Sequence, residues 1–443
     1  MRAKLALLSL IMILFTACQK EPPFPILKGT NQYSSQVVTE WMALLLKLTQ
    51  EGPGFSPPVA ARAFGYTGLT LYESVRPGMP GYKSMTGQVN ELSADMLPQA
   101  EEKTYHWAAV ANAALATIIR SCYNNATAEN LAAIDDLESR LYYVFSQKTF
   151  PQAVLDRSVA FGKRVGDAMV YYAISDNQGS SYNSNFPDSY IPPVGEGLWV
   201  PTPPAYQKAL LPYWGTVRPF LTRNLEEAFP PPPPDYSLEP TSVFWQETLE
   251  VYNTIKNLTA EQRNMAAFWS DDPGNSATPP GHSVAILKQV LEEEDASLAL
   301  AAEAFAKVGM GVHDAFVSCW HTKYHYNLVR PITVIRQYID ADFTIPLNTP
   351  PFPEYPSGHS VQSGASSRIL TDLFGDNYAF TDHLHESRSD FDGRARSFNS
   401  FYDFAQEAAI SRLYGGIHFR SAIEVGLEQG KKIGSNISVL RFR

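Results

Sequence analysis

The sequence predicts a mainly α-helical fold. Apolar residues recur with helical spacing along most of the chain, whereas no run alternates between apolar and polar residues as half-buried strands do. With 443 residues, of which 44% are hydrophobic and 18% charged, the chain can bury a large core. This length exceeds that of one ordinary core, so two subdomains or one large helical domain are expected.

Residues 1–17 have the features of an export signal. Arg2 and Lys4 precede an apolar run, 5–15, that is too short for a permanent membrane span. Small residues stand directly before Cys18, as they do at the cleavage site of bacterial lipoproteins. We therefore expect a lipid anchor on Cys18, followed by a tether over 18–32. An ordinary cleaved secretory signal is the alternative.

The region 33–240 is predicted to form an N-terminal helical half. Its last part, 176–240, is rich in proline, glycine, tyrosine and serine, and 230–234 is a run of prolines. This irregular segment is either a linker or a functional cover, and its aromatic residues favour packing over disorder. The helices expected before it span 35–48, 58–75, 100–121, 126–145 and 152–174.

The region 241–443 is predicted to form a C-terminal helical domain. Pro331 disfavours helical backbone at Arg330, so one helix should end near there and Arg330 should turn inward. No stretch of this region is long and apolar enough to predict a membrane span. The expected helices span 242–255, 260–269, 283–293, 297–324, 359–374 and 401–414, with one more after His418.

The net charge of −10 argues against nucleic acid or an anionic membrane as a partner. Any site for an anion must therefore be a local positive pocket, and the expected partners are small molecules. Association with a membrane is expected only through the anchor. Beyond Cys18, the chain has Cys122 and Cys319, which either form one disulfide or are buried thiols.

The stretch 352–359, Phe-Pro-Glu-Tyr-Pro-Ser-Gly-His, is a proline-stiffened turn that leads into a helix. The first N–H groups of a helix lack intrahelical partners, so they suit an oxyanion. Ser357 can cap the helix and donate its hydroxyl, and Gly358 allows close approach of the backbone to a ligand. His359 can accept or supply a proton near neutral pH.

Two further stretches bring cations and a second imidazole. Lys323 and Arg330 are seven residues apart, which is two turns on one helix face if the segment is helical that far. Arg412 and His418 lie on either side of a glycine pair, 415–416, that can break a helix. Three cations, a hydroxyl, a helix start and two imidazoles suit a tetrahedral oxyanion such as phosphate or vanadate.

In this order, the patterns Lys323-x6-Arg330-Pro, Pro-Ser-Gly-His and Ser-Arg412-x5-His418 resemble the motifs of vanadium-dependent haloperoxidases and of the related PAP2-type acid phosphatases. The resemblance is tightest over 268–434. It implies two four-helix bundles with the active site in the C-terminal one. It also implies vanadate as the cofactor, with phosphate able to occupy the site in its absence.

The haloperoxidase resemblance implies oxidation of a halide, iodide or bromide, by hydrogen peroxide. His418 would bind vanadate through Nε2, vanadium would act as a Lewis acid toward peroxide, and His359 would move protons. In the phosphatase alternative His418 is the nucleophile that forms a phosphohistidine, and His359 protonates the leaving alcohol. In both, the oxyanion would be held by Lys323, Arg330, Ser357, Gly358 and Arg412.

The residues beside the oxyanion favour the haloperoxidase. Trp320 and Phe352 match aromatics that line the halide side in fungal chloroperoxidases, although each could be a packed core residue. Asp272 resembles the family aspartate that pairs with the motif arginine, here Arg412, and Asp271 is the neighbouring alternative. The family aspartate that follows the motif histidine is Ala422 here. Glu424 could replace it as the partner that orients His418.

Other polar clusters are expected to lie at the surface. His321 and His325 have the spacing of two metal ligands, but no third ligand of suitable spacing follows, so they are expected to be solvated. A polar loop between the second and third motifs contains His383, His385, Arg388, Arg394 and Arg396.

A third class of function is a non-catalytic lipoprotein that only binds an oxyanion. Such a protein would not need two histidines beside three cations. We therefore rank it below the haloperoxidase, and below the phosphatase as the alternative enzyme.

Overall fold

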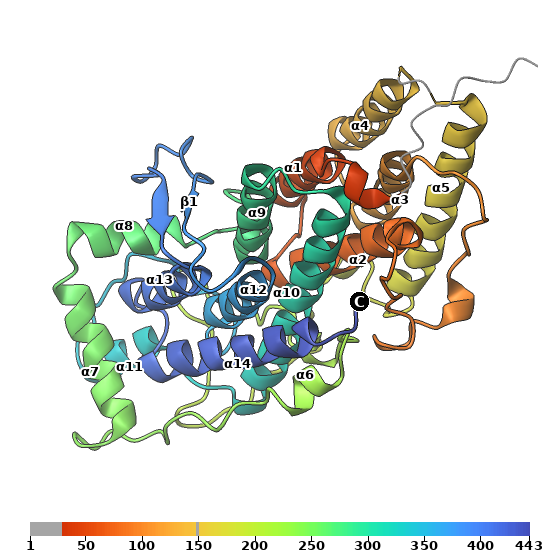
Figure 1. Ribbon diagram of the computed structural model, residues 1–443. Coiled ribbons are helices and arrows are strands. Elements are labelled where there is room, and N and C mark those ends of the chain that lie inside the picture. Colours follow the sequence, from red (N-terminus) through yellow and green to blue (C-terminus); the bar gives the residue numbers. More distant parts are fainter. Residues whose placement is uncertain (1–28, 148–149) are drawn as a thin grey trace, which may run out of the picture.

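The computed structural model describes residues 29–147 and 150–443 and is mainly α-helical, as predicted (Figure 1). Residues 1–28, with the predicted signal and Cys18, lie outside the described part. The one sheet within it is a hairpin of β1 (Phe380–Asp382) and β2 (Arg396–Phe398). The sequence predicted no strands, and this prediction is wrong for the hairpin. Strands of three residues are too short to show an alternating pattern.

The N-terminal half contains the five expected helices. Its third helix begins seven residues later than predicted, because His106 has an extended backbone and its Nδ1 accepts the N–H of Ala109 at 3.1 Å. The helices are α1 (Gln36–Glu51), α2 (Pro57–Val75), α3 (Trp107–Cys122), α4 (Ala128–Ser146) and α5 (Gln152–Ile174). Short 3-10 turns span Thr30–Gln32, Arg76–Gly78, Ala94–Met96, Ser181–Asn183 and Trp214–Thr216.

The C-terminal half has one helix that was not predicted. Pro331 was interpreted as ending a helix, yet it is also the first residue of α11 (Pro331–Tyr338), where its missing N–H has no cost. The prolines in the first turn of α9 are tolerated for the same reason. The other helices of this half are α7 (Val243–Lys256), α8 (Ala260–Phe268), α9 (Thr278–Glu293), α10 (Leu298–Tyr326), α12 (Gly358–Phe374), α13 (Phe401–Tyr414) and α14 (Arg420–Ser438). The irregular segment before α7 also contains one short helix that was not predicted, α6 (Arg223–Glu226).

The two halves pack against each other along α2 and α10, which cross near the middle of the molecule in Figure 1. Glycines make this crossing unusually close. A Cβ on Gly68 would lie 2.4 Å from the carbonyl oxygen of Phe305, and one on Gly309 would lie 2.6 Å from that of Phe64. One hydrophobic core therefore extends through both halves.

The irregular segment before α7 is packed, as its aromatic content predicted. Trp199, Trp214 and Phe220 are almost completely buried. The carbonyl oxygen of Leu210 accepts hydrogen bonds from Trp320 Nε1 at 3.2 Å and from the Tyr324 hydroxyl at 2.7 Å, which fixes the segment on α10. It is a cover over the C-terminal half and not a free linker.

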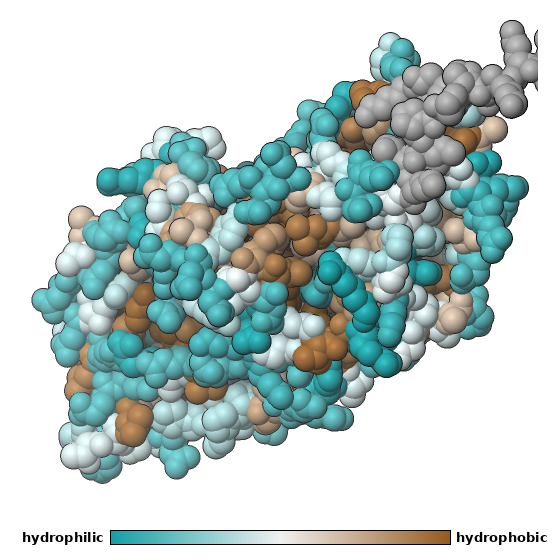
Figure 2. All heavy atoms as spheres, viewed as in Figure 1, coloured by the Kyte–Doolittle hydropathy of each residue, from teal (hydrophilic) through white to brown (hydrophobic). Residues whose placement is uncertain are grey.

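The face shown in Figure 2 is dominated by hydrophilic residues, with separate hydrophobic patches between them. Among residues 29–147 and 150–443, no helix combines the length and apolar character needed to span a membrane. Cys122 and Cys319 are both free and buried, so the buried-thiol alternative is the one observed.

Candidate active site

A cavity of about 600 Å³ opens where the two halves and the irregular segment meet. Its lining includes 52–57 from the loop between α1 and α2, Leu210 from the irregular segment, and 347–352 before the Pro-Ser-Gly-His motif. Gly358, His359, Arg412 and His418 reach it from the C-terminal half. The expected irregular cover thus forms part of the cavity wall.

The start of α12 is built as the motif predicted. Ser357 is the N-cap, its Oγ accepts the N–H of Ser360 at 3.4 Å, and its own N–H donates to Ala422 O at 3.0 Å. Gly358 is the first residue of the helix. A Cβ there would lie 3.6 Å from the Trp320 ring, so a side chain would fill space in front of that ring.

Lys323 and Arg330 are both completely buried, but they do not share a helix. The helix α10 ends at Tyr326, since Asn327 has a left-handed backbone (φ 50°). Lys323 donates to the carbonyl oxygens of Pro353 and Glu354, each at 2.9 Å. Arg330 turns inward as predicted and donates to Phe352 O at 2.9 Å and to Ile417 O at 2.7 Å.

Burial shapes the charge of these cations. It lowers the pKa of Lys323 to about 7 and the pKa of Arg330 to about 10. It also lowers the pKa of Arg412 to about 10, against the opposing field of Asp271 and Asp272. An anion bound among the three would oppose this shift in each of them and keep them charged.

Arg412 and His418 are separated by the break that the glycine pair predicted. The helix α13 ends at Tyr414, and Gly416 has a positive φ of 74° that glycine adopts without strain. Arg412 donates to Ser411 Oγ and to Ala266 O, each at 2.9 Å. His418 lies directly before α14, and its side chain is 2% exposed.

Glu354 is the partner of His418, and it was missed at the sequence level. Its Oε1 lies 2.8 Å from His418 Nδ1 and also accepts the N–H of Phe419 at 2.9 Å. Because this oxygen accepts the Phe419 N–H, Nδ1 is the donor to it, and Nε2 carries the lone pair that accepts from Arg330. Nε2 lies 3.3 Å from Arg330 Nη1 on the cavity side.

The suggestion that Glu424 takes this role is wrong. Glu424 lies on the solvent side of α14, 64% exposed and 3.6 Å from Arg420. Ala422 leaves no carboxylate at the family position, and Glu354 approaches the same imidazole from the other motif. Burial raises the pKa of Glu354 to about 7, against the pull of Arg330 and Lys323. An acidic residue directly inside the 352–359 stretch was the available signal.

His359 is the second imidazole of the cavity. Burial, and then the charge of Arg412, lower its pKa to about 3, while hydrogen bonding to the backbone at Trp269 and Ser270 opposes this. The ring is therefore neutral at physiological pH. Its Nε2 is buried and has no hydrogen-bond partner among the described residues.

Trp320 and Phe352 form one side of the cavity, with their ring centroids 4.8 Å apart. Lys323 Nζ lies 4.9 Å and Arg330 Cζ 5.0 Å from the Phe352 centroid. These cation–π contacts hold both cations beside an apolar surface. The two aromatics are therefore both packed and cavity-lining.

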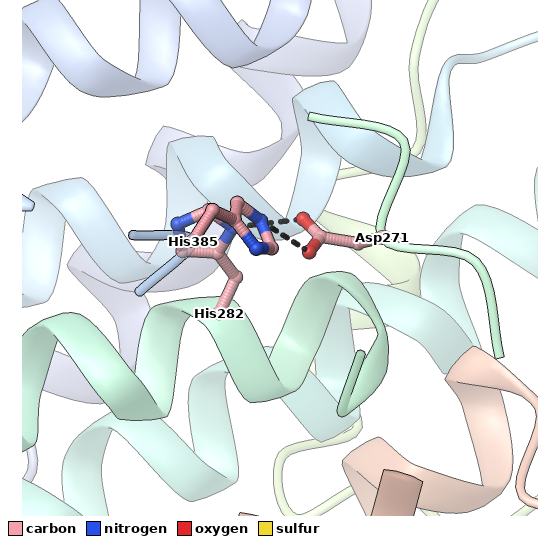
Figure 3. A group of neighbouring side chains, drawn as sticks. All are labelled: Asp271, His282 and His385. Atoms are coloured by element: carbon pink, nitrogen blue, oxygen red, sulfur yellow. Dashed lines mark hydrogen bonds and ion pairs between the residues drawn. The ribbon is translucent and has the colours of Figure 1, made fainter. Parts of the chain in front are cut away.

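The predicted ion pair between Asp272 and Arg412 is not formed. In the described part of the chain no carboxylate lies within ion-pairing distance of Arg412, whose guanidinium is directed at Ala266 and Ser411. Asp272 is exposed at the rim of the cavity. Asp271 is buried instead, and its carboxylate faces His282 and His385 (Figure 3).

The remaining predicted polar residues are mostly at the surface. His321 and His325 are exposed and pack edge-to-face on the ring of Phe229. Of the loop between the second and third motifs, His383 and Arg394 are exposed, and Arg388 and Arg396 are half-buried. His385 is the exception, because it is 3% exposed and packs against Phe268. Its surface assignment is therefore corrected.

The residues around the cavity fit a vanadate-sized oxyanion. Lys323, Arg330 and Arg412 are buried without a carboxylate ion-pair partner in the described residues. Arg330 Nη2 and His359 Nε2 are buried polar atoms that lack a hydrogen-bond partner there. Buried donors of this kind are normally satisfied, so the unpartnered atoms of His359, which lines the cavity, and of Arg330, which contacts the cavity residue His418, indicate an anionic ligand.

Comparison with known proteins finds vanadium chloroperoxidases. A family model described as the VCPO second helical-bundle domain matches residues 303–345 and 339–440. The vanadium chloroperoxidase of Curvularia inaequalis is 24% identical over 502 residues, which cover 90% of this chain and 81% of that protein. A bacterial vanadium-dependent chloroperoxidase shares the fold, with a TM-score of 0.67 at 16% identity over 88% of this chain and 93% of that one.

A solved bacterial vanadium-dependent iodoperoxidase is more similar in both sequence and structure. Its chain superposes with a TM-score of 0.82 and is 35% identical, covering 96% of this chain and 99% of that one. This degree of identity over nearly the whole of both chains shows common family membership. The chain therefore belongs to the vanadium-dependent haloperoxidases, a family of peroxidases.

Proposed function

We propose that this haloperoxidase oxidises iodide in preference to bromide and chloride, with vanadate held in the cavity beside His418. The observation that carries the assignment of the site is the geometry of His418. Glu354 fixes the proton on Nδ1, so the Nε2 lone pair faces the cavity beside Arg330. A neutral imidazole held in this way suits coordination to a metal centre.

The other ligand roles are assigned to donors in and beside the cavity, of which Gly358 and Arg412 line it. Lys323, Arg330 and Arg412 would neutralise the oxygens of vanadate, and the Ser357 hydroxyl and the Gly358 N–H would donate to them. Bound vanadate supplies a Lewis acid that activates hydrogen peroxide toward attack by halide. The overall reaction converts hydrogen peroxide, halide and one proton into hypohalous acid and water.

His359 is the proton carrier in this proposal. Its neutral ring can accept a proton from hydrogen peroxide at the unpartnered Nε2. An anion beside it would oppose the shift that burial and Arg412 impose, so the pKa of His359 would rise. The ring could then return the proton to the departing oxygen.

The order of halide rates is expected to be iodide above bromide above chloride. Iodide is the easiest of the three to oxidise, and the similar solved protein is an iodoperoxidase. Trp320 and Phe352 resemble chloroperoxidase residues, so the measured order of rates tests whether these two aromatics determine the halide preference. Steady-state rates for the three halides at equal peroxide concentration measure it, and a chloride rate above the iodide rate would reverse the assignment.

A paired assay of the parent and His359→Ala distinguishes the haloperoxidase from a phosphatase. The vanadate-loaded parent is expected to oxidise iodide, and His359→Ala to lose most of this activity, by about 100-fold or more. An aryl phosphate with a good leaving group hardly needs the proton, so the variant should keep any hydrolysis that the vanadate-free parent shows. Rapid phosphate-ester hydrolysis without halide oxidation at any vanadate concentration would establish the phosphatase.

We also propose that the protein is exported and anchored by lipid on Cys18, which lies outside the described residues. The motif before Cys18 supports this placement. The full chain is expected in the membrane fraction, and Cys18→Ser should release it, because the anchor is the only membrane attachment proposed. Mass spectrometry of the mature N-terminus measures the modification; an unmodified terminus at another residue would disprove the anchor.

A further inference from the structure

A second cluster of titratable side chains lies in the cavity wall, formed by Asp271, His282 and His385 (Figure 3). Asp271 also lines the cavity, whereas His282 and His385 do not. Asp271 belongs to the loop between α8 and α9, His282 to α9, and His385 follows β1. All three are at most 3% exposed. One ligand atom from each, two imidazole nitrogens and a carboxylate oxygen, lie within 4.8 Å of one another.

We propose that Asp271, His282 and His385 bind a divalent transition-metal ion of the Zn²⁺ class, separate from the vanadate site. Two imidazoles and one carboxylate are the protein ligands of many Zn²⁺ sites that keep a fourth position open. Among the described residues, no fourth histidine, cysteine, aspartate or glutamate belongs to the group. Its ligands come from three segments that are distant in sequence, so only the folded chain assembles it.

Two of the ligand atoms have no hydrogen bond of good geometry in the described chain. Asp271 Oδ1 and His385 Nε2 are buried atoms with no hydrogen-bond partner in the described chain, and they lie 3.3 Å apart. Ligand atoms about 2.0–2.1 Å from a tetrahedral Zn²⁺ are roughly 3.3 Å from each other. The observed separation therefore matches two ligands that share an ion better than it matches a hydrogen bond.

Asp382 supplies the outer support that metal-binding histidines usually have. Its Oδ2 lies 2.6 Å from His282 Nε2, and its Oδ1 accepts the N–H of Leu384 at 2.9 Å. A carboxylate on the far nitrogen of a ligating histidine fixes the ring and makes the near nitrogen a better ligand. The near nitrogen, Nδ1, is the one that faces Asp271 at 2.8 Å.

The competing arrangement is a metal-free network in which a protonated His282 bridges two carboxylates. The carboxylates raise the pKa of His282 to about 10 against the effect of burial, so this network is stable without an ion. A metal would have to displace the Nδ1 proton. The network, however, leaves His385 Nε2 and Asp271 Oδ1 with only their 3.3 Å contact to each other, whereas an ion would bind both.

A metal here would have a structural role in the cavity wall. It would join the α8–α9 loop, α9 and the end of β1, and this loop contributes Ser270, Asp271 and Asp272 to the cavity lining. None of the proposed vanadate ligands belongs to the cluster. Occupancy can therefore be measured with vanadate, peroxide and halide all absent, and its failure would not bear on the haloperoxidase proposal.

The test is Zn²⁺ binding by the chelator-treated, vanadate-free protein. We expect one Zn²⁺ per chain by elemental analysis after gel filtration, a rise in the unfolding temperature, and the visible absorption of four-coordinate Co²⁺ when Co²⁺ replaces Zn²⁺. His385→Gln should lose the ion and the Co²⁺ absorption. Asp382→Asn should weaken binding about 10- to 100-fold.

Matched controls are exposed histidines that the proposal leaves out. His383→Gln and His321→Gln should each keep one Zn²⁺ with unchanged affinity. A parent protein that binds no Zn²⁺ and gives no Co²⁺ absorption would establish the metal-free network. Undiminished binding in His385→Gln would also overturn the proposal, because the ion would then bind elsewhere. If His385→Gln fails to fold, the parent spectrum and the Asp382→Asn affinity still decide between the two.

Discussion

Replacement of His418 by alanine is expected to abolish halide oxidation, by at least about 1,000-fold, and to remove tight vanadate binding. In the proposed site His418 provides the one bond from the chain to vanadium, whereas each cation contributes diffuse charge that its neighbours can partly replace. The variant should fold normally, because the alanine leaves the contact between Glu354 and the Phe419 N–H in place. Steady-state iodide oxidation and vanadate calorimetry measure the two losses.

His321→Ala is the matched control, since His321 is an exposed histidine of α10 outside the cavity lining. It should keep the parent rate and affinity. Arg412→Ala is expected to have a vanadate affinity and an iodide rate between those of His418→Ala and His321→Ala. Excess vanadate should partly restore its rate. Vanadate affinity in His418→Ala equal to that of the parent would show that His418 does not bind vanadate.

Replacement of Glu354 by alanine is expected to cause the second large loss of vanadate affinity and iodide oxidation. It removes the acceptor for His418 Nδ1 and for the Phe419 N–H, so both buried donors lose their partner and the ring can rotate or change tautomer. Losing such a supporting carboxylate typically costs about 10- to 100-fold in metal affinity or activity. Vanadate affinity and the iodide rate at saturating vanadate are measured separately.

The variant Glu354→Gln tests whether Glu354 acts by positioning the His418 ring through its hydrogen bonds. Its amide oxygen can still accept both hydrogen bonds, so most of the activity lost in Glu354→Ala should return. Glu424→Gln, the exposed carboxylate first considered as the partner, should match the parent in both measurements. If Glu354→Ala leaves vanadate affinity unchanged, Glu354 does not position His418.

Local patterns predicted most of the helices and the three motifs, because helix starts, caps and breaks depend on neighbouring residues. The N-cap at Ser357, the break at Gly416 and the inward turn at Arg330 are all local features of this kind. The start of α11 was missed because Pro331 is compatible with the end of one helix and with the start of another; here it starts α11, and α10 ends earlier, at Tyr326. The short hairpin offered too few residues for a periodic signal.

Contacts between distant segments could not be predicted in the same way. Glu354 and His418 are 64 residues apart, and only the packing of α12 against α14 brings their segments together. His385 stands in a polar stretch, yet the aromatic rings of Phe268 and Phe391 cover it. Its partner Asp271 was considered only as an alternative partner for Arg412, since sequence spacing does not show which way a carboxylate turns.

The glycine-mediated crossing of α2 and α10 makes the two halves interdependent in folding. Neither helix can separate without exposing apolar surface of the other, because Gly68 and Gly309 bring their backbones into direct contact. The halves should then form one cooperative unit, in which the amides at the crossing exchange with solvent only through global unfolding. The cavity, which takes its walls from both halves, would persist as long as that whole unit does.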